Sequence, residues 1–396
     1  MPSTDASALP DAQRRWSLAA AITSVTVFGL SIGQAVPVMS LLLEERGTDA
    51  SLNGLNAGSA FIGVMIGPLL APRLIRWFGI RNFLIAGFVA DIALFLAMKP
   101  LDSMGAWFVL RALLGLIGSA IFTSSEAWIN QLAGDIGRGR TIGIYAAALS
   151  AGFGIGPLLL AITGINGWAP FVANGAITAL AIVPLLGVGD ASRSFGRERG
   201  GSPLVMFMRA PLIVGVVAIF GLYESALMAL LPIWGVRSGL DNRMAAAALT
   251  AVYGGSILMQ MLVGWLSDAV SRVAALRLCG VVGLAGALTL ALVPQPLALV
   301  FGALFLWGGI AAGIYPVALS MAGDRFRGAD LVAVNAAIIM AYGLGALVGP
   351  ALGGVAMDIR DPQGLLWLFV AAFAALLAAT ARQAATAGPR LPRGTA

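Results

Sequence analysis

The chain has 396 residues, of which 59% are hydrophobic and only 11% are charged. A soluble globular domain carries about 25% charged residues, so this composition excludes a water-facing surface over most of the molecule and favours an integral membrane protein. The net charge of +6 comes from cations scattered over the predicted loops rather than gathered in a basic patch, which argues against nucleic-acid binding.

Rare residue types exclude several kinds of chemistry. The chain has no histidine and a single cysteine, Cys279, so metal sites built from these residues and serine–histidine–aspartate triads are excluded. Its single lysine, Lys99, does not belong to a phosphate-binding G-x-x-x-x-G-K-[ST] loop. We therefore expect no enzyme activity, no metal and no cofactor, and if the chain moves a solute, an ion gradient rather than ATP would supply the energy.

Apolar stretches long enough to cross a bilayer, which takes about 20 helical residues, recur along the whole chain. In the first part they are expected near 17–43, 52–72, 83–99, 105–129, 141–163 and 168–188. In the second part they are expected near 210–235, 244–267, 274–293, 297–322, 331–356 and 364–381. The predicted fold class is all-α with twelve transmembrane helices: a six-helix bundle over 1–189, a cytoplasmic linker over 190–209 and a second six-helix bundle over 210–396.

The distribution of positive charge supports an even number of helices. With the N-terminus in the cytoplasm, eighteen lysines and arginines fall in cytoplasmic segments and five fall on the other side. Cytoplasmic loops are enriched in positive charge, and an odd helix count would scramble this division. We therefore predict a multi-pass protein of the bacterial cytoplasmic (inner) membrane with both termini in the cytoplasm.

Two sequence blocks recur about 190 residues apart, at equivalent places in the two sets of helices. The run G-D-x-x-R-G begins at Gly134 after the fourth helix and at Gly323 after the tenth. The run G-x-x-x-G-P occupies 152–157 in the fifth helix and 345–350 in the eleventh. Such repeats are typical of transporters built from two related halves.

Small residues four positions apart let two helices approach closely in lipid. The residues for which we expect this helix-packing role are Gly152, Gly156, Pro157, Gly345, Gly349 and Pro350.

Several motifs resemble those of the major facilitator superfamily, and the similarity extends over nearly the whole chain. Its loop motif G-x-L-x-D-x-x-x-R is present at 264–272, whereas the corresponding run at 67–73 in the first half lacks the aspartate. The fourth helix carries Arg111 followed by spaced glycines, as in the family. The G-x-x-x-G-P run of the fifth helix resembles the motif of proton-coupled drug antiporters.

The resemblance implies two six-helix bundles around a central cavity lined mainly by helices one, four, seven and ten. The bundles would rock to expose the cavity to alternate sides of the membrane. In the family, each loop aspartate contacts a helix of the opposite half. We therefore expect a one-sided gating latch made by Asp268 and Arg272 near Arg140, with no equivalent at Ala71 and Pro72.

Four ionisable residues fall inside predicted transmembrane helices, where a charge is costly and commonly functional. Asp91 in helix three and Arg111 in helix four are expected at similar depths, which suggests a buried charge pair. The alternative is that Asp91 faces another helix and Arg111 serves the cavity alone.

Two carboxyl groups are candidates for proton coupling. Glu224 lies near the middle of helix seven, and Glu126 lies nearer the cytoplasmic end of helix four. A desolvated carboxyl group can hold a proton at neutral pH and release it when water enters. We therefore predict Glu224 as the main proton-coupling residue and Glu126 as a secondary one, with an internal hydrogen bond or a solvated helix end as the alternative roles.

Polar and aromatic side chains on the cavity helices are candidates for substrate contact, although aromatic residues at helical spacing more often serve packing. The candidates are Gln34, Phe122, Thr123, Tyr223, Trp307, Tyr315, Asn335 and Tyr342. The predicted helices contain few polar groups, which argues against sugars and favours an amphipathic or aromatic compound. The expected partners are such a small-molecule substrate, protons and the lipid bilayer, with the protein acting as a monomer.

Three functions remain open from the sequence. Proton-coupled export of a small amphipathic molecule agrees with the antiporter-like motif and the two carboxyl groups. Proton symport that imports a metabolite is the second, and an anionic substrate would then have only Arg111 as a cationic contact. A lipid flippase or a membrane sensor is the third, although no soluble sensing domain is expected.

Overall fold

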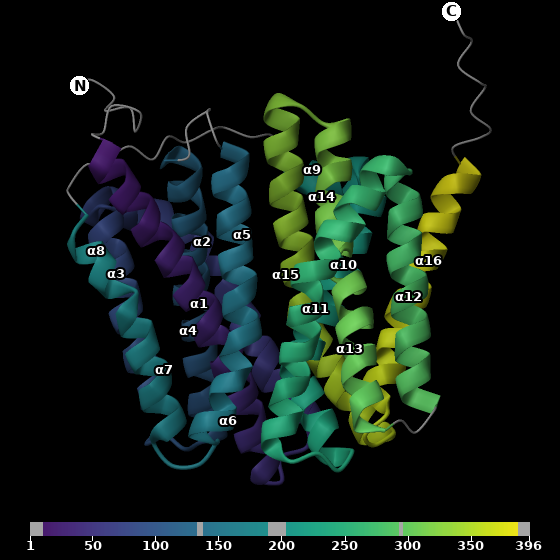
Figure 1. The fold of residues 1–396 in the computed structure, drawn as a ribbon, viewed down its shortest axis with the longest axis horizontal. Helices are drawn as coiled ribbons and strands as arrows, with labels where there is room; N and C mark the ends of the chain where they lie inside the picture. Colours follow the sequence, from purple (N-terminus) through teal and green to yellow (C-terminus); the bar gives the residue numbers. More distant parts are fainter. Residues whose placement is uncertain (1–10, 133–137, 189–202, 293–295, 387–396) are drawn as a thin grey trace, which may run out of the picture.

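A computed structural model describes residues 11–132, 138–188, 203–292 and 296–386, which form α-helices joined by short turns (Figure 1). No β-strand occurs in these four ranges. They contain 11 helices long and apolar enough to cross a membrane, together with a shorter apolar helix over Ala147–Thr163. The all-α membrane fold is therefore confirmed, and the shorter helix accounts for the twelfth predicted span.

The first half contains six spans, of which the last two are interrupted. Its helices are α1 (Asp11–Glu45), α2 (Ala50–Phe78), α3 (Ile80–Ala97), α4 (Met104–Leu132), α5 (Arg138–Ile155), α6 (Leu159–Thr163), α7 (Ala169–Leu180) and α8 (Ile182–Leu186). The 3-10 turn η2 (Gly156–Leu158) separates α5 from α6. Each interruption lies next to a proline, Pro157 or Pro184, whose ring clashes with the preceding helical turn and which lacks a backbone donor.

The second half repeats this arrangement after a short helix. Its helices are α9 (Pro203–Arg209), α10 (Pro211–Arg237), α11 (Asn242–Ala269), α12 (Arg272–Leu292), α13 (Leu297–Ala311), α14 (Ile314–Arg325), α15 (Gly328–Ile359) and α16 (Gly364–Thr386). The tenth span consists of α13 and α14. The predicted linker over 190–209 ends in α9, and its residues up to 202 lie outside the described part of the chain.

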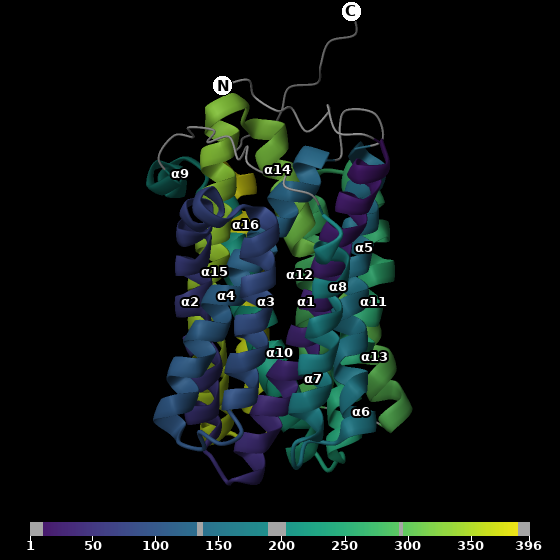
Figure 2. The ribbon, with the colours of Figure 1, turned by 90° about the vertical axis from the view of Figure 1, so that its left-hand side faces the viewer.

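The helices pack in the same pairs in both halves. In the first half α1 packs on α5, α2 on α4, and α3 on α7. In the second half the equivalent spans pair in the same way, α10 with α15, α11 with α13, and α12 with α16. Figure 2 shows the first half facing the viewer, with its long helices running in the same general direction as those behind them. The repeat detected in the sequence is therefore also a repeat of helix packing.

Glycines set how closely these helices approach. A Cβ atom added at Gly152 would lie 2.5 Å from a carbonyl oxygen of α1, and one at Gly156 would lie 2.7 Å from another. For Gly345 and Gly349 the corresponding distances to carbonyl oxygens of α10 are 1.9 and 2.2 Å. A methyl group at any of these positions would overlap the facing helix, so the backbones meet here directly.

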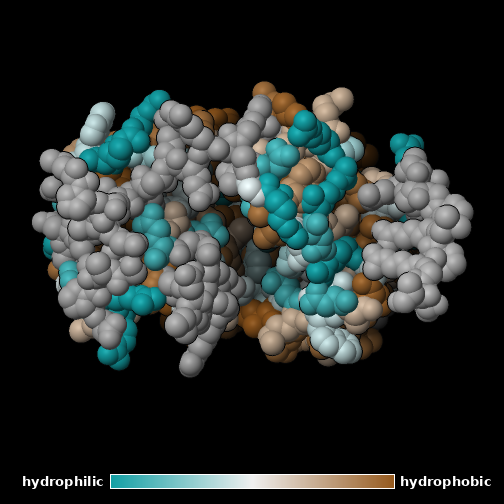
Figure 3. All heavy atoms as spheres, turned by 90° about the horizontal axis from the view of Figure 1, so that it is seen from above, coloured by the Kyte–Doolittle hydropathy of each residue, from teal (hydrophilic) through white to brown (hydrophobic). Residues whose placement is uncertain are grey.

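Between the halves, α2 packs on α15 and α5 packs on α11, and α10 also contacts α1 and α2. We call the membrane face where α1 ends and α2 begins the far face, and the face where α1 begins and α16 ends the near face. Close to the far face, a Cβ atom at Gly54 would lie 1.9 Å from the carbonyl oxygen of Pro350. Seen from the near face, the surface is hollowed between the halves (Figure 3). The halves therefore meet at the far face and part toward the near face.

Candidate functional site

The second half brings a carboxyl group and a tyrosine together midway along α10. The Tyr342 hydroxyl of α15 donates a hydrogen bond of 3.0 Å to Oε2 of Glu224 in α10, and both side chains are half-buried. The ring of Tyr342 lies 6.3 Å from that of Phe220 and 6.2 Å from that of Tyr315, measured between centroids. Three aromatic rings therefore stand beside the carboxyl group.

The first half contributes a second carboxyl group, Glu126 of α4. The Tyr145 hydroxyl of α5 forms a hydrogen bond with it. Tyr315 of α14 is close enough to interact electrostatically with both Glu126 and Glu224, and Tyr253 of α11 interacts in this way with Glu224. The two carboxyl groups, which come from different halves, therefore lie within electrostatic reach of the same tyrosine.

The chain has five tyrosines, and each of them interacts with at least one of these two carboxyl groups through a hydrogen bond or electrostatically. The sequence analysis identified Tyr315 and Tyr342 as site residues but missed Tyr145, Tyr253 and the neighbouring Phe220. The scarcity of tyrosine was the available signal, because a buried tyrosine hydroxyl usually finds a polar partner, although that of Tyr223 has none. A tyrosine can both donate and accept hydrogen bonds while its ring contacts apolar groups.

Tyr223 and Trp307, both predicted to contact substrate, are packed inside the second half in the described conformation. Each is only 2% exposed in the core of the second half. The Tyr223 ring lies 5.8 Å from that of Trp307 and 5.0 Å from those of Phe369 and Phe373 in α16. Successive residues of an α-helix point about 100° apart. Tyr223 therefore faces α16, whereas its neighbour Glu224 bonds to α15.

Gln34, another predicted substrate contact, is also packed inside one half in this conformation. Its side chain is fully buried, and its Nε2 donates a hydrogen bond of 3.1 Å to the carbonyl oxygen of Pro170. Its Oε1 accepts a bond of 3.4 Å from Nδ2 of Asn174, which also bonds to Ser31. The amide thus joins α1 to α7, because a buried polar group needs partners within the protein.

Three further predicted substrate contacts are half-buried. The Phe122 ring stacks on that of Phe28 with centroids 5.4 Å apart, and Oγ1 of Thr123 bonds to the carbonyl oxygen of Ser119 in its own helix. Asn335 has an Oδ1 atom that is buried without a partner. Phe122, Thr123 and Asn335 remain predictions as substrate contacts.

The predicted charge pair of Asp91 and Arg111 does not form. Arg111 is 2% exposed, its Nε contacts the sulfur of Met39 at 3.3 Å, and its buried Nη2 has no partner. Asp91 is half-buried in α3, and no hydrogen bond or ion pair of the described residues joins it to Arg111. The positions of the two residues along their helices indicate similar depths in the membrane. They do not indicate in which direction each side chain points around its helix.

On the near face, the residues of the predicted latch bind one another. Asp268 and Arg272 form an ion pair, and Nε of Arg272 also contacts Oδ2 of Asp324 at 3.0 Å. All three residues belong to the second half. The side chain of Arg140 lies outside the described residues, so the contact between Asp268 and the first half stays a prediction.

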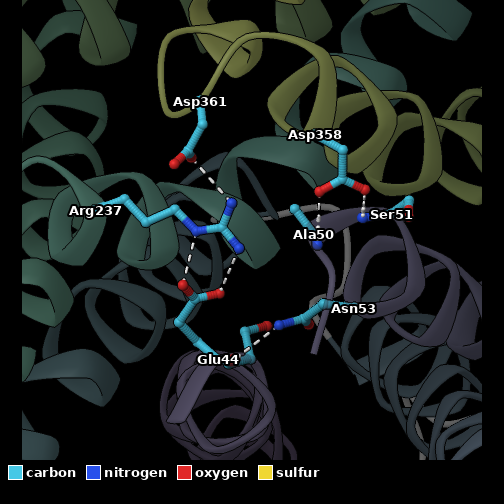
Figure 4. A network of polar contacts seen from close by, with 8 residues as sticks. Glu44, Ala50, Ser51, Asn53, Arg237, Asp358 and Asp361 are labelled. Atoms are coloured by element: carbon cyan, nitrogen blue, oxygen red, sulfur yellow. Dashed lines mark hydrogen bonds and ion pairs between the residues drawn. The ribbon is translucent and has the colours of Figure 1, made fainter. Parts of the chain in front are cut away.

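A polar network on the far face was missed by the sequence analysis (Figure 4). Arg237 at the end of α10 binds both carboxylate oxygens of Glu44 at the end of α1, at 2.7 and 3.0 Å, and Asp361 after α15 at 2.9 Å. Glu44 and Arg237 are 193 residues apart in the sequence, so no local pattern connects them. The network fastens the first half to the second.

Comparison with known proteins identifies the family. The sequence model of the Major Facilitator Superfamily matches residues 19–252 and 213–395, and the chain therefore belongs to this superfamily. The MFS-type transporter YfkF of Bacillus subtilis is 26% identical over 351 residues, which cover 87% of this chain and 89% of that protein. An MFS-type transporter of Yersinia pseudotuberculosis is 26% identical over 360 residues, covering 89% and 92%.

Solved structures agree on the fold. A mutant of the nucleoside transporter NupG superimposes with a TM-score of 0.80 at 12% identity, covering 93% of this chain and 99% of its own. A bacterial homologue of the human lysosomal transporter Spinster, in an inward-facing and unoccupied conformation, superimposes with a TM-score of 0.75 at 15% identity, covering 94% and 96%. The protein is therefore a multi-pass secondary transporter that moves a small molecule across the bilayer by alternating access, and it is not an enzyme.

Proposed function

We propose that the protein exports a small amphipathic or aromatic molecule in exchange for protons. The observation that carries this proposal is that Tyr315 lies within electrostatic reach of both Glu126 and Glu224, which come from different halves. Alternating access moves the halves relative to each other and so changes the hydration of both carboxyl groups. The proton affinity of a carboxyl group depends on its hydration. Such a pair can therefore take up protons on one side of the membrane and release them on the other.

The surroundings of Glu224 support an aromatic substrate. The rings of Phe220, Tyr315 and Tyr342 provide apolar faces, and the hydroxyl and carboxyl groups beside them provide a few directional polar contacts, as ligand pockets commonly do. No ion pair of the described residues involves Glu224. A neutral or cationic compound therefore fits this part of the site better than an anion does.

We further propose that the near face is cytoplasmic, with the protein in the bacterial inner membrane and both termini inside the cell. The division of positive charge, eighteen against five, supports this orientation. The described conformation then opens inward. A monomer is the proposed functional unit, because α4 and α5 of one half and α10, α14 and α15 of the other bring the site together within a single chain.

Purified protein in liposomes tests both the coupling and its direction. The probes are permanently charged aromatic cations and neutral aromatic compounds, because weak bases accumulate in acidic vesicles without a transporter. Proton antiport predicts that a transported probe accumulates when the lumen is acidic, and that a protonophore abolishes this accumulation. Accumulation only when the external medium is acidic would indicate symport instead. A probe that exchanges across the membrane but ignores both gradients would contradict proton coupling.

A further inference from the structure

The N-terminus of α2 is bound by a residue of the other half. The backbone amides of Ala50 and Ser51 donate hydrogen bonds of 3.0 and 2.9 Å to Oδ1 and Oδ2 of Asp358 in α15 (Figure 4). The first amides of a helix have no acceptor within the helix, and a negative charge is favourable at this end. Asp358 therefore caps α2 across the interface between the halves.

The residue that precedes α2 is itself an aspartate. Asp49 occupies the N-cap position with φ −55° and ψ 145°, and its side chain accepts no capping hydrogen bond. Aspartate is among the preferred residues at this position because its carboxylate can accept a bond from the second or third amide of the helix. A potential cap for α2 is therefore present in its own half and not in use.

The equivalent turn of the second half shows what an aspartate at this position can do. Asp241 precedes α11, and its Oδ1 accepts a hydrogen bond of 2.7 Å from the amide of Met244. Both turns carry a glycine with positive φ two residues before the aspartate, Gly47 at 71° and Gly239 at 94°. The second half thus caps its helix from within, whereas the first half leaves Asp49 unbonded.

We propose that Asp358 and Asp49 exchange as the cap of α2 during the transport cycle. Asp358 caps the helix while the far face is closed, and Asp49 caps it when the far face opens. Alternating access requires the halves to part at this face, which withdraws Asp358 from Ala50 and Ser51. With Asp49 as a replacement, α2 is capped in both conformations, and the two aspartates together set the ratio of open to closed protein. The exchange applies equally to import and export, so it stands apart from the proposed function.

Distances between spin labels on opposite halves measure this ratio in the full-length reconstituted protein. Leu101→Cys and Ser238→Cys place the labels on exposed far-face residues, with the native thiol removed by Cys279→Ser. Asp358→Ala is expected to raise the ratio of open to closed protein about fivefold, the usual effect of losing a cap. Asp358→Asn retains an acceptor and should give a smaller rise.

A second substitution separates cap exchange from a general loosening of the interface. Asp49→Ala in the Asp358→Ala background should lower the ratio again about fivefold, because the open conformation then loses its cap as well. Asp102→Ala is the matched control, since Asp102 is an exposed far-face carboxylate whose ion pair with Arg46, at 2.5 Å, lies within the first half. It should leave the ratio unchanged. A ratio unaffected by Asp358→Ala, or one that Asp49→Ala leaves unchanged or raises further, would overturn the proposal.

Discussion

The second spans of the two halves, α2 and α11, begin at equivalent turns but are held differently. α11 is capped from within by Asp241, whereas α2 is capped from the other half by Asp358. A cap within a half stabilises that half in every conformation. A cap supplied by the other half stabilises only the conformation in which the halves touch. The comparison shows that the sequence repeat departs from symmetry where an interaction must depend on conformation.

The two turns also differ in the charges that they carry. Glu45 precedes Gly47 by two residues, as Arg237 precedes Gly239, so equivalent positions carry opposite charges. Both reach across the interface: Arg237 binds Glu44, and Oε1 of Glu45 accepts a bond of 3.0 Å from Nδ2 of Asn242. The far face is thus held by complementary groups that two identical halves would not provide.

The largest effect is expected where the backbones of the two halves meet. Gly54→Ala would place a methyl group 1.9 Å from the carbonyl oxygen of Pro350, so the far face should no longer close and the closed population should fall by about a hundredfold. Gly345→Ala is the control, because its methyl group would meet Ala218 at 1.9 Å within the second half and should lower thermal stability instead. A closed population that survives Gly54→Ala would show that the helices repack freely.

Arg237→Gln should give the next largest effect. It removes the charged contacts of Arg237 with Glu44 and Asp361, and hydrogen bonds to charged groups are worth about 2 kcal/mol. We expect the ratio of open to closed protein to rise about thirtyfold in spin-label measurements. Glu44→Gln completes a double-mutant cycle, and strictly additive effects of the two substitutions would argue that this pair does not fasten the far face.

Asp241→Ala should separate stability from conformation. Loss of the cap of α11 should lower the free energy of unfolding by about 1 kcal/mol, which a lower midpoint in thermal unfolding would reveal. The ratio of open to closed protein should stay that of the unmodified protein, because the bond to Met244 lies within one half in either conformation. A changed ratio would mean that the two turns are less different than their hydrogen bonds indicate.

The smallest effects are expected in the exposed near-face network. Asp268→Asn and Asp324→Asn each remove one carboxylate from Arg272, and exposed ion pairs contribute about 0–1 kcal/mol. If Asp268 also forms the predicted latch with the first half, only Asp268→Asn should shift the protein toward the near-face-open conformation, by less than about fivefold. Spin labels on the near face measure this shift, and equal responses to both substitutions would argue against the latch.

The helices could be predicted from the sequence because crossing a bilayer imposes long apolar segments with charges at their ends. The fifth helix, predicted as continuous over 141–163, is interrupted at η2 (Gly156–Leu158), although Pro157 was visible in its motif. The packing of α1 on α5 and of α10 on α15 follows the G-x-x-x-G-P repeat. The number and positions of the helices depend on local sequence, which was sufficient to predict them, whereas the interruption at η2 was missed.

The site was harder to predict because a membrane helix is apolar on most of its surface. Hydropathy therefore does not tell which side of a helix meets the cavity, and Tyr223, predicted to line the cavity, packs against α16 in the structure. Glu224 and Tyr342 were each named as candidates, but their bond joins residues 118 apart in the sequence. Asp358 and Asp49 look like ordinary loop charges until the structure places one of them against α2.

Proton coupling through Glu224 is tested most directly by comparing two modes of transport in liposomes. Glu224→Gln imitates a permanently protonated side chain, so it should exchange substrate across the membrane but fail to accumulate it in response to a pH gradient. Tyr342→Phe is the matched control, because it removes the hydrogen bond to Glu224 and keeps the carboxyl group. This variant should still accumulate substrate. If Glu224→Gln accumulates substrate in response to a pH gradient at the rate of the unmodified protein, Glu224 does not couple transport to protons.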